Sequence, residues 1–165
     1  MRIATVLSTL TAVALSVGAG SLQAQSGSIQ ATATVLTAIT VTGTNPLAFG
    51  NVTPGVNKTI AITDATAGLF SVVKQAATSV ALTFTLPANL TSGANNMPIG
   101  TWTGGWNNTA NTPVGATSFT PSAAATTVPS GGANLWVFVG GTVAPAAAQA
   151  AGAYVGTVTM QVAYL

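Results

Sequence analysis

Apolar and polar residues alternate along much of this chain with a period of two. In the first such run, apolar side chains stand at Ile29, Ala31, Ala33, Val35, Ile39 and Val41, mostly separated by Thr and Gln. This alternation, rich in β-branched residues, is typical of a strand with one buried face. The run spans about 13 residues, or about 43 Å as a strand, roughly twice the ordinary strand length. We expect either a bend between two sheets or two halves that belong to different places.

A second alternating stretch lies at the end of the sequence. Polar side chains at Thr157, Thr159 and Gln161 face one way, and apolar ones face the other. We predict a strand whose apolar face packs on the core. The apolar set is Tyr154, Val158, Met160, Val162 and Tyr164.

Shorter segments between these two runs also have strand character. The predicted strands are 58–63, 69–74, 79–86 and 135–139, with weaker candidates at 98–106 and 115–120. About eight short strands separated by turn signals favour an all-β fold, and we predict an immunoglobulin-like β-sandwich over residues 25–165.

Gly and Pro suggest where the predicted strands end. We interpret the Gly-Gly pairs at 104–105, 131–132 and 140–141 as turns and residues 122–132 as a loop. Residues 144–151 fit either a short helical turn, because Ala is the best helix former, or an extended loop.

The first 24 residues have the features of an export signal. Arg2 provides the positive start, an apolar stretch follows, and small residues lead to a cleavage site between Ala24 and Ser26. We therefore expect an exported protein that passes through the periplasm and ends outside the cell or on its surface. We expect no transmembrane anchor in the mature chain.

Ionisable side chains are almost absent. The chain has three basic residues, one acidic residue, and neither His nor Cys. Catalysis at neutral pH needs groups that transfer protons, an activated nucleophile or a metal. We therefore predict a protein that is not an enzyme, with no catalytic residues, no metal site and no cofactor. Nucleic-acid binding needs clustered cations, so we expect no nucleic-acid partner either.

Two weak candidates for polar chemistry remain. Asp64 is the one carboxylate that a calcium site can use, but a lone Asp between Thr residues is more often a turn residue that binds its own backbone. A Ser–Lys pair, Lys74 with Ser71 or Ser79, is formally open. We favour the simpler interpretation that Lys74 is a solvated lysine at a strand end.

Two tryptophans offer a candidate binding surface. Trp102 and Trp106 are four positions apart, which places both indoles on one face of a strand. They fit a platform that stacks against a glycan, but we favour the simpler interpretation that they plug the core or cover its end. The first interpretation supports an alternative function as a self-contained secreted binding module for glycans or surface adhesion.

Three motifs occur in order along the mature chain. They are the alternating N-terminal run leading to Leu47-Ala48-Phe49-Gly50-Asn51-Val52-Thr53-Pro54-Gly55, the strand ending Phe84-Thr85-Leu86-Pro87, and Gly140-Gly141-Thr142 followed by the stretch from Ala151 to Tyr164. Together they resemble the bacterial secreted domain-of-unknown-function family 4402. More distantly, the chain is similar to spore coat protein U domains, which include archaic chaperone–usher pilins.

The pilin resemblance implies a specific way of assembling. Such pilins are incomplete sandwiches that receive a missing strand from the N-terminal extension of a neighbour. It implies that residues 25–36, with Ile29, Ala31, Ala33 and Val35, form the donor strand, and that Ile39 and Val41 begin the domain's own first strand. The acceptor groove would then lie along the final strand, Tyr154 to Tyr164.

The function expected from this resemblance is structural. We expect a non-catalytic subunit of a surface pilus, filament or matrix that self-associates into a homopolymer, with a periplasmic chaperone and usher as partners. Two departures keep a self-contained sandwich open as an alternative. The chain lacks the cysteine pair usual in coat-type pilins, and Ala31 and Ala33 are small for side chains that fill a groove.

Overall fold

A computed structural model describes residues 25–165, so the predicted export signal, residues 1–24, lies outside the described part. The described residues divide into residues 25–34, which belong to a first unit, and a second unit, Val35–Leu165. Residues 25–34 of the first unit contain neither helix nor strand. Across the described residues no helix has the length and apolar character needed to cross a membrane.

The second unit consists of strands and connecting loops. It contains ten strands: β1 (Thr40–Asn45), β2 (Lys58–Ile60), β3 (Gly68–Val73), β4 (Val80–Thr85), β5 (Asn89–Ser92), β6 (Asn95–Asn107), β7 (Thr117–Phe119), β8 (Thr126–Val128), β9 (Asn134–Val143) and β10 (Thr159–Tyr164).

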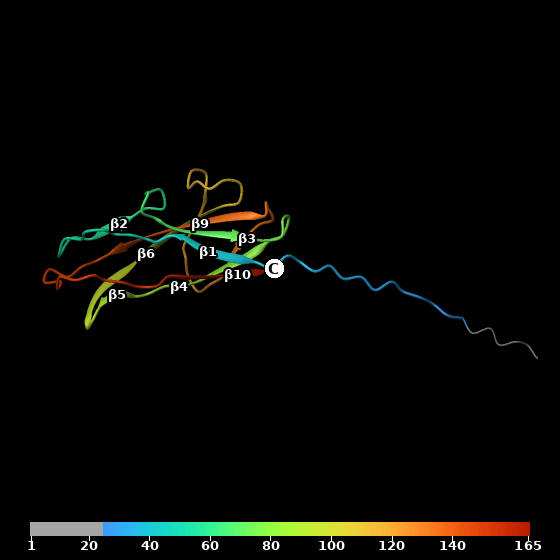
Figure 1. Cartoon of the computed structure of the whole chain (residues 1–165), viewed down its shortest axis with the longest axis horizontal. Helices are drawn as coiled ribbons and strands as arrows, with labels where there is room; N and C mark the ends of the chain where they lie inside the picture. Colours follow the sequence, from blue (N-terminus) through green and yellow to red (C-terminus); the bar gives the residue numbers. More distant parts are fainter. Residues whose placement is uncertain (1–24) are drawn as a thin grey trace, which may run out of the picture. The chain divides into compact units, whose positions relative to one another are not determined.

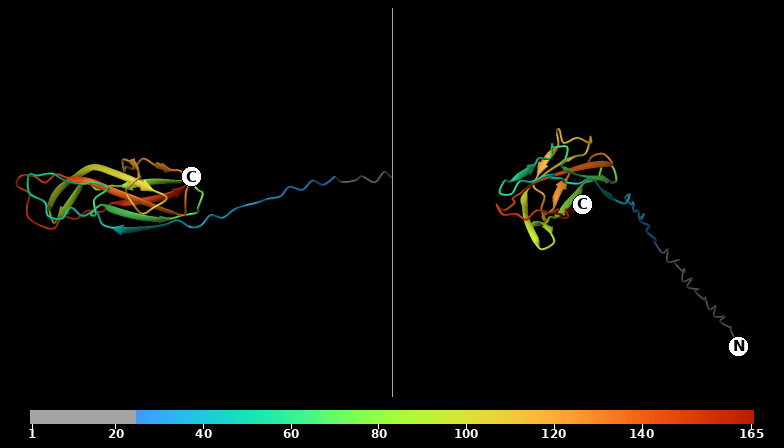
Figure 2. Two further views of the ribbon diagram at one scale, coloured as in Figure 1. Left: turned by 90° about the horizontal axis from the view of Figure 1, so that it is seen from above. Right: turned by 60° about the vertical axis from the view of Figure 1, so that its left-hand side comes forward.

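These strands form two antiparallel sheets. The larger has seven strands in the order β1-β3-β9-β6-β5, with β2 also pairing β9 and β7 also pairing β6; the smaller has the order β10-β4-β8. Figure 1 shows β4 and β10 below β3 and β9, and Figure 2 shows the same domain from two other sides. The predicted all-β sandwich is confirmed.

The long strand β9 organises the larger sheet. Its first part pairs with β3, its last three residues pair with β2, and β6 lies along its other edge. Consequently β2 and β3 share one edge of β9, one after the other. The change from one partner to the next divides the sheet into two halves.

Each half of the larger sheet has its own core cluster. The first cluster is shared with the smaller sheet and consists of Val72, Val80, Leu82, Phe84, Val128, Leu135, Val137, Val139 and Met160. The second consists of Phe49, Ile60, Ala67, Met97, Ile99 and Val143. Most of the first cluster is completely buried, with Leu82 and Leu135 at 0% exposure. The apolar positions of the alternating strands thus lie where their pattern predicts.

Several predicted boundaries were wrong. The structure adds β5 and β8, the latter within the predicted loop 122–132. Both are short and built mainly from Asn, Thr and Ser, so they lack the apolar alternation that marks a strand. β10 covers only the last six residues of the stretch predicted from Tyr154, because the preceding residues have a single bridge, Thr91 to Val155.

Two of the Gly-Gly pairs were also misinterpreted, because 104–105 and 140–141 lie inside β6 and β9 rather than in turns. Close contacts explain their presence. A Cβ on Gly140 would clash with the carbonyl oxygen of Ile60, and one on Gly104 would lie 2.6 Å from the ring of Phe119. Glycine is therefore required at these two positions, because a neighbouring backbone or ring leaves no room for a side chain. Close approach of this kind is a common reason for glycine in strands.

The structure answers two questions about local conformation that the sequence left open, one for residues 144–151 and one for the early alternating run. Residues 144–151 form a loop with one turn and no helix. The early alternating run enters the domain only at its end, because β1 begins at Thr40 and pairs with β3 from Thr40 opposite Val73.

Candidate functional site

A large groove opens in the sandwich domain, with a volume of about 1120 Å³. Its floor comes from the inner face of the larger sheet, through side chains such as Phe70 of β3, Met97 and Ile99 of β6, and Val143 of β9. None of the residues described as lining it belongs to the smaller sheet. The groove therefore marks the part of the larger sheet that lacks a second layer of strands.

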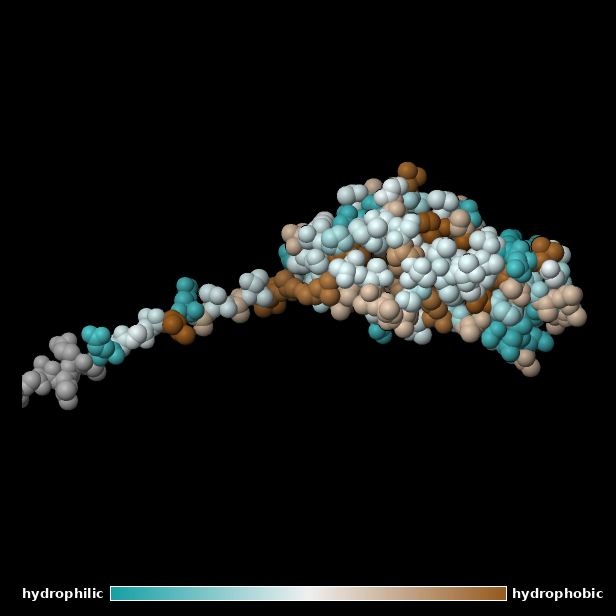
Figure 3. All heavy atoms as spheres, turned by 180° about the vertical axis from the view of Figure 1, so that it is seen from behind, coloured by the Kyte–Doolittle hydropathy of each residue, from teal (hydrophilic) through white to brown (hydrophobic). Residues whose placement is uncertain are grey.

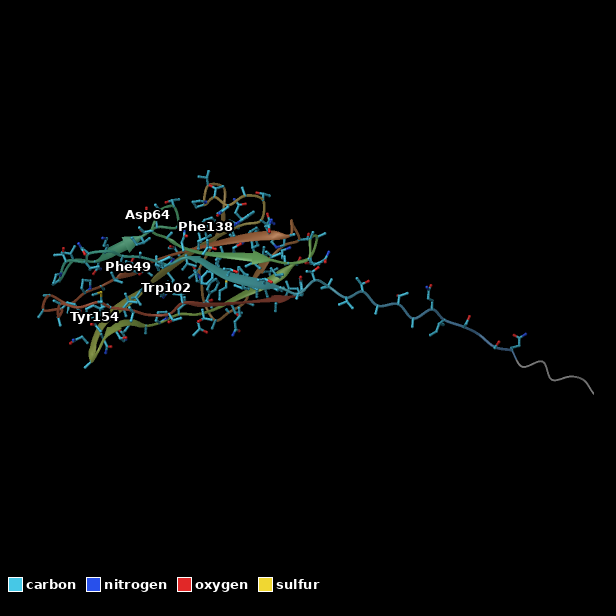
Figure 4. The ribbon with its side chains drawn as sticks, viewed as in Figure 1. Phe49, Asp64, Trp102, Phe138 and Tyr154 are labelled. Carbon is cyan, nitrogen blue, oxygen red and sulfur yellow. The ribbon has the colours of Figure 1, made fainter. Side chains whose placement is uncertain are left out.

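Two segments outside the sheets complete the lining, Pro46–Val52 and Gly152–Val158. The first follows β1 and is held by a hydrogen bond from Ala48 N to Thr66 O of 3.0 Å. The second precedes β10 and exchanges two backbone hydrogen bonds with Thr91 through Val155. Both run beside the open layer without completing it. Figure 4 shows Phe49 and Tyr154 in this half of the domain.

Trp102 lies on the floor of the groove and is half-buried. It packs against both core clusters. The pairing of β6 with β9 shifts register between Gly100 and Thr103, and Thr101 has φ of 46°, so a bulge sets the direction of the indole. Its ring would lie 3.2 Å from a Cβ on Gly141. The glycine thus leaves room for the indole against the β9 backbone.

Trp106 is also half-buried, but it packs only against the first cluster. The two tryptophans that the sequence grouped therefore both contact the core, and only Trp102 lines the groove. The adjacent Asn107 is 7% exposed and its Oδ1 accepts hydrogen bonds from Thr109 and Ala110. It holds the loop after β6 in place.

Neutral hydrogen bonds shape the rim of the groove. The hydroxyl of Tyr154 accepts from Nε2 of Gln149 at 2.6 Å and donates to the carbonyl of Ala150 at 2.8 Å. Gln149 also donates to the carbonyl of Asn96, which ties the rim to β6. No lysine or acidic residue is among the described lining residues. The groove is suited to an uncharged, largely apolar occupant.

The candidate acceptor strand borders this groove. Tyr154 and Val158 line it, whereas Met160, Val162 and Tyr164 face the first cluster further along β10. Within the described residues, β10 pairs only with β4, and β1 pairs only with β3. Val41 of β1 lies opposite the buried Val72 yet is 38% exposed. β1 and β10 are therefore edge strands of their sheets.

The candidate donor residues have exposed side chains. Ile29 is 97% and Val35 is 94% exposed, and Ala31 and Ala33 are also exposed. No strand includes any of them.

Lys74 differs from its sequence-based interpretation, which was wrong. Its side chain is only 2% exposed, and Nζ donates to the carbonyl oxygen of Thr78 at 2.8 Å. Burial lowers the pKa of Lys74 from its ordinary value. The loop after β3 folds over this amine, which a local sequence pattern does not reveal.

Asp64 behaves as the favoured interpretation predicts. Its Oδ2 accepts a hydrogen bond from the backbone N of Ala61 at 2.8 Å, so it closes the turn that follows β2. This is the usual local role of Asp in a turn.

The surface is nearly uncharged as well. Viewed from behind, the atoms are mostly pale, because Thr, Ser, Gly and Ala have intermediate hydropathy, with strongly apolar atoms scattered between them (Figure 3). Such a surface offers little electrostatic protection against self-association.

Comparison with known proteins provides one match. The family described as Domain of unknown function (DUF4402) matches residues 39–164, which is almost the whole sandwich unit. No curated protein and no solved structure matches the chain.

Proposed function

Since the chain belongs to the DUF4402 family, whose description names no activity, we propose a function from its structure. It is a non-catalytic structural subunit of a surface filament or matrix, and its copies assemble by strand exchange. Residues 25–36 of one copy provide a strand that fills the groove of another. One observation carries the proposal: an apolar groove lined by the end of edge strand β1 and by the residues just before edge strand β10 occurs in a chain whose apolar N-terminal segment has no strand partner among the described residues.

The size and lining of the groove favour a peptide segment. Its volume of about 1120 Å³ leaves room for an extended peptide segment. Open strand edges supply backbone donors and acceptors, and the apolar floor supplies contacts for alternate side chains. This combination is typical of recognition by strand addition.

The donor segment matches the groove in charge and pattern. Its apolar side chains recur at every second residue, so one face of an added strand can cover Trp102 and the floor around it. Small side chains at Ala31 and Ala33 suit positions where the added strand passes close to the floor. No lysine or carboxylate has to lose its hydration on either side.

Strand exchange also suits the composition. A nearly uncharged β-protein with open edges risks unspecific edge-to-edge association. Filling each groove with a defined segment pairs the edges and removes this hazard. During export the open groove would need cover, and a periplasmic chaperone followed by an usher would meet this need before the subunit reaches the cell surface.

The test compares the mature chain with a variant that lacks residues 27–35. We expect the mature chain to form oligomers that resist SDS unless heated, because a filled groove completes the core. The deletion variant should remain folded and monomeric. Monomers alone in both the purified mature protein and shed surface material would contradict the proposal.

Matched substitutions distinguish specific strand addition from nonspecific association. Ile29→Asp with Val35→Asp places charges on the apolar face of the donor and should abolish oligomers. Gln30→Asp with Thr34→Asp places the same charges on the other face and should preserve them. Equal loss in both variants would point to charge repulsion instead.

A further inference from the structure

The structure fixes the point at which the N-terminal segment joins the sandwich. The hydroxyl of Tyr164 accepts a hydrogen bond from the backbone N of Gln75 at 2.6 Å and donates one to the carbonyl oxygen of Thr37 at 2.7 Å. Oγ1 of Thr37 also lies 2.8 Å from Oε1 of Gln75. We call these three residues the exit clasp. They tie the residues before β1 to the last strand and to the loop after β3.

The exit clasp and the groove lie at opposite ends of β10. Tyr164 pairs with Val80 at one end, and Thr159 pairs with Thr85 at the other. The groove is lined by Pro87 and by Gly152–Val158, beyond the Thr159 end. A six-residue strand is about 20 Å long, which separates the two. The C-terminus marks the clasp end in Figure 1, and Phe49 and Tyr154 mark the other end in Figure 4.

To occupy its own groove, the segment would have to reverse direction just before β1. It would run back beside β1 and therefore parallel to β10, because β1 and β10 run in opposite directions along the sandwich. Parallel pairing is slightly less stable per residue than antiparallel pairing.

The sequence just before β1, where the chain would have to reverse, does not favour a tight turn. Tight hairpins use Asn, Asp or Gly, which tolerate positive φ. Residues 35–38 are Val, Leu, Thr and Ala, of which two are β-branched. In addition, the carbonyl and hydroxyl of Thr37 are already engaged in the exit clasp.

We infer that the exit clasp and the turn-poor sequence beside it prevent the donor segment from filling its own groove and direct it to a second copy. This inference rests on the proposed strand exchange. Donor and acceptor are then different surfaces at opposite ends of the domain. Such a donor–acceptor contact is heterologous, so subunits can add head to tail.

The test installs the missing turn. The double variant Leu36→Asn with Thr37→Gly creates an Asn-Gly pair suited to a two-residue hairpin and removes the Thr37 hydroxyl. The control, Leu36→Ala with Thr37→Ala, removes the same side chains without favouring a turn. Mass in solution is measured by light scattering, and protection of residues 25–36 by hydrogen exchange.

We expect oligomers from the wild type and from the Ala–Ala control, and monomers with protected residues 25–36 from the Asn–Gly variant. Oligomers from the Asn–Gly variant at the wild-type level would overturn the inference, as would monomers from the control. A monomeric wild type with protected residues 25–36 would show self-filling, which contradicts the inference but preserves strand complementation. A monomeric wild type with unprotected residues 25–36 would contradict the proposed function itself.

Discussion

The two halves of the sandwich are built from the same larger sheet but are completed differently. Over the first cluster, β4, β8 and β10 form a second layer, and side chains such as Leu82, Leu135 and Val137 are fully buried. Over the second cluster no described strand forms that layer, and Phe49, Met97 and Ile99 keep 6–8% exposure beneath loops and the groove.

The two halves therefore have different roles in the proposed assembly: the closed half stabilises the fold, and the open half binds a further segment. The closed half can hold the fold in a single copy, because its apolar side chains already have partners from both sheets. The open half contains the groove, and grooves with a largely apolar lining are common binding sites. A chain without cysteine has no disulfides to hold the domain, so the closed half must supply most of its stability.

The largest effect should come from the closed half. Leu82→Ala removes a completely buried side chain from the first cluster and should lower the free energy of unfolding by about 2–5 kcal/mol. Urea denaturation of the monomeric variant that lacks residues 27–35 measures this loss. Leu165→Ala is the control, because Leu165 is 72% exposed and its loss should change stability by less than about 0.5 kcal/mol. Equal losses would mean that the closed half is not the stable one.

The junction between the halves should be the next most sensitive. Gly140→Ala places a methyl group against the carbonyl of Ile60, and such overpacking should cost about 1–3 kcal/mol. Gly100→Ala is the matched control within the same sheet, since nothing lies within 4 Å of its Cβ position. Thermal unfolding of both variants checks this, and an unaffected Gly140→Ala would disprove the close approach of β2.

A groove residue should affect assembly more than folding. Leu90→Ala trims a half-buried side chain of the groove lining and should lower the free energy of unfolding of the variant that lacks residues 27–35 by only about 1 kcal/mol. The same change should weaken binding of a peptide comprising residues 25–36, measured by calorimetry. Undiminished peptide binding would place the donor strand elsewhere.

The smallest expected effect is a dependence of stability on pH. Because burial lowers the pKa of Lys74, the unfolded chain binds more protons than the folded one between that lowered pKa and 10.5. The free energy of unfolding should therefore rise as pH increases toward 10.5 and fall as pH decreases through this window. Lys74→Met should remove this contribution, whereas Lys58→Met should keep it. Identical pH profiles for wild type and Lys74→Met would contradict it.

Local patterns predicted much of the closed half. Alternation identified β3, β4 and β10 and the buried faces of the last two. Apolar and polar side chains must alternate along a strand that has one buried and one solvent-exposed face. It missed β5 and β8, because each is only three or four residues long and contributes a single apolar side chain, Leu90 or Val128, to the core clusters. It also ended β9 at Gly140, since the reason for that glycine is contact with Ile60, far away in sequence.

The candidate site was only partly visible in the sequence. Tyr154 and Val158 were predicted to belong to the acceptor and do line the groove, whereas Phe49, Leu90 and Met97 were not singled out as part of it. Their side chains belong to different elements, and only the folded sheet brings them together.

The amino-acid sequence by itself determined the faces of the strands and the absence of His, Cys and Glu, because periodicity and composition are local properties. The tertiary structure alone decided where the second layer is missing, that Lys74 is buried, and that Tyr164 holds Thr37. Those two clasp residues are 127 positions apart, and a contact of that kind depends on how all the strands between them pack.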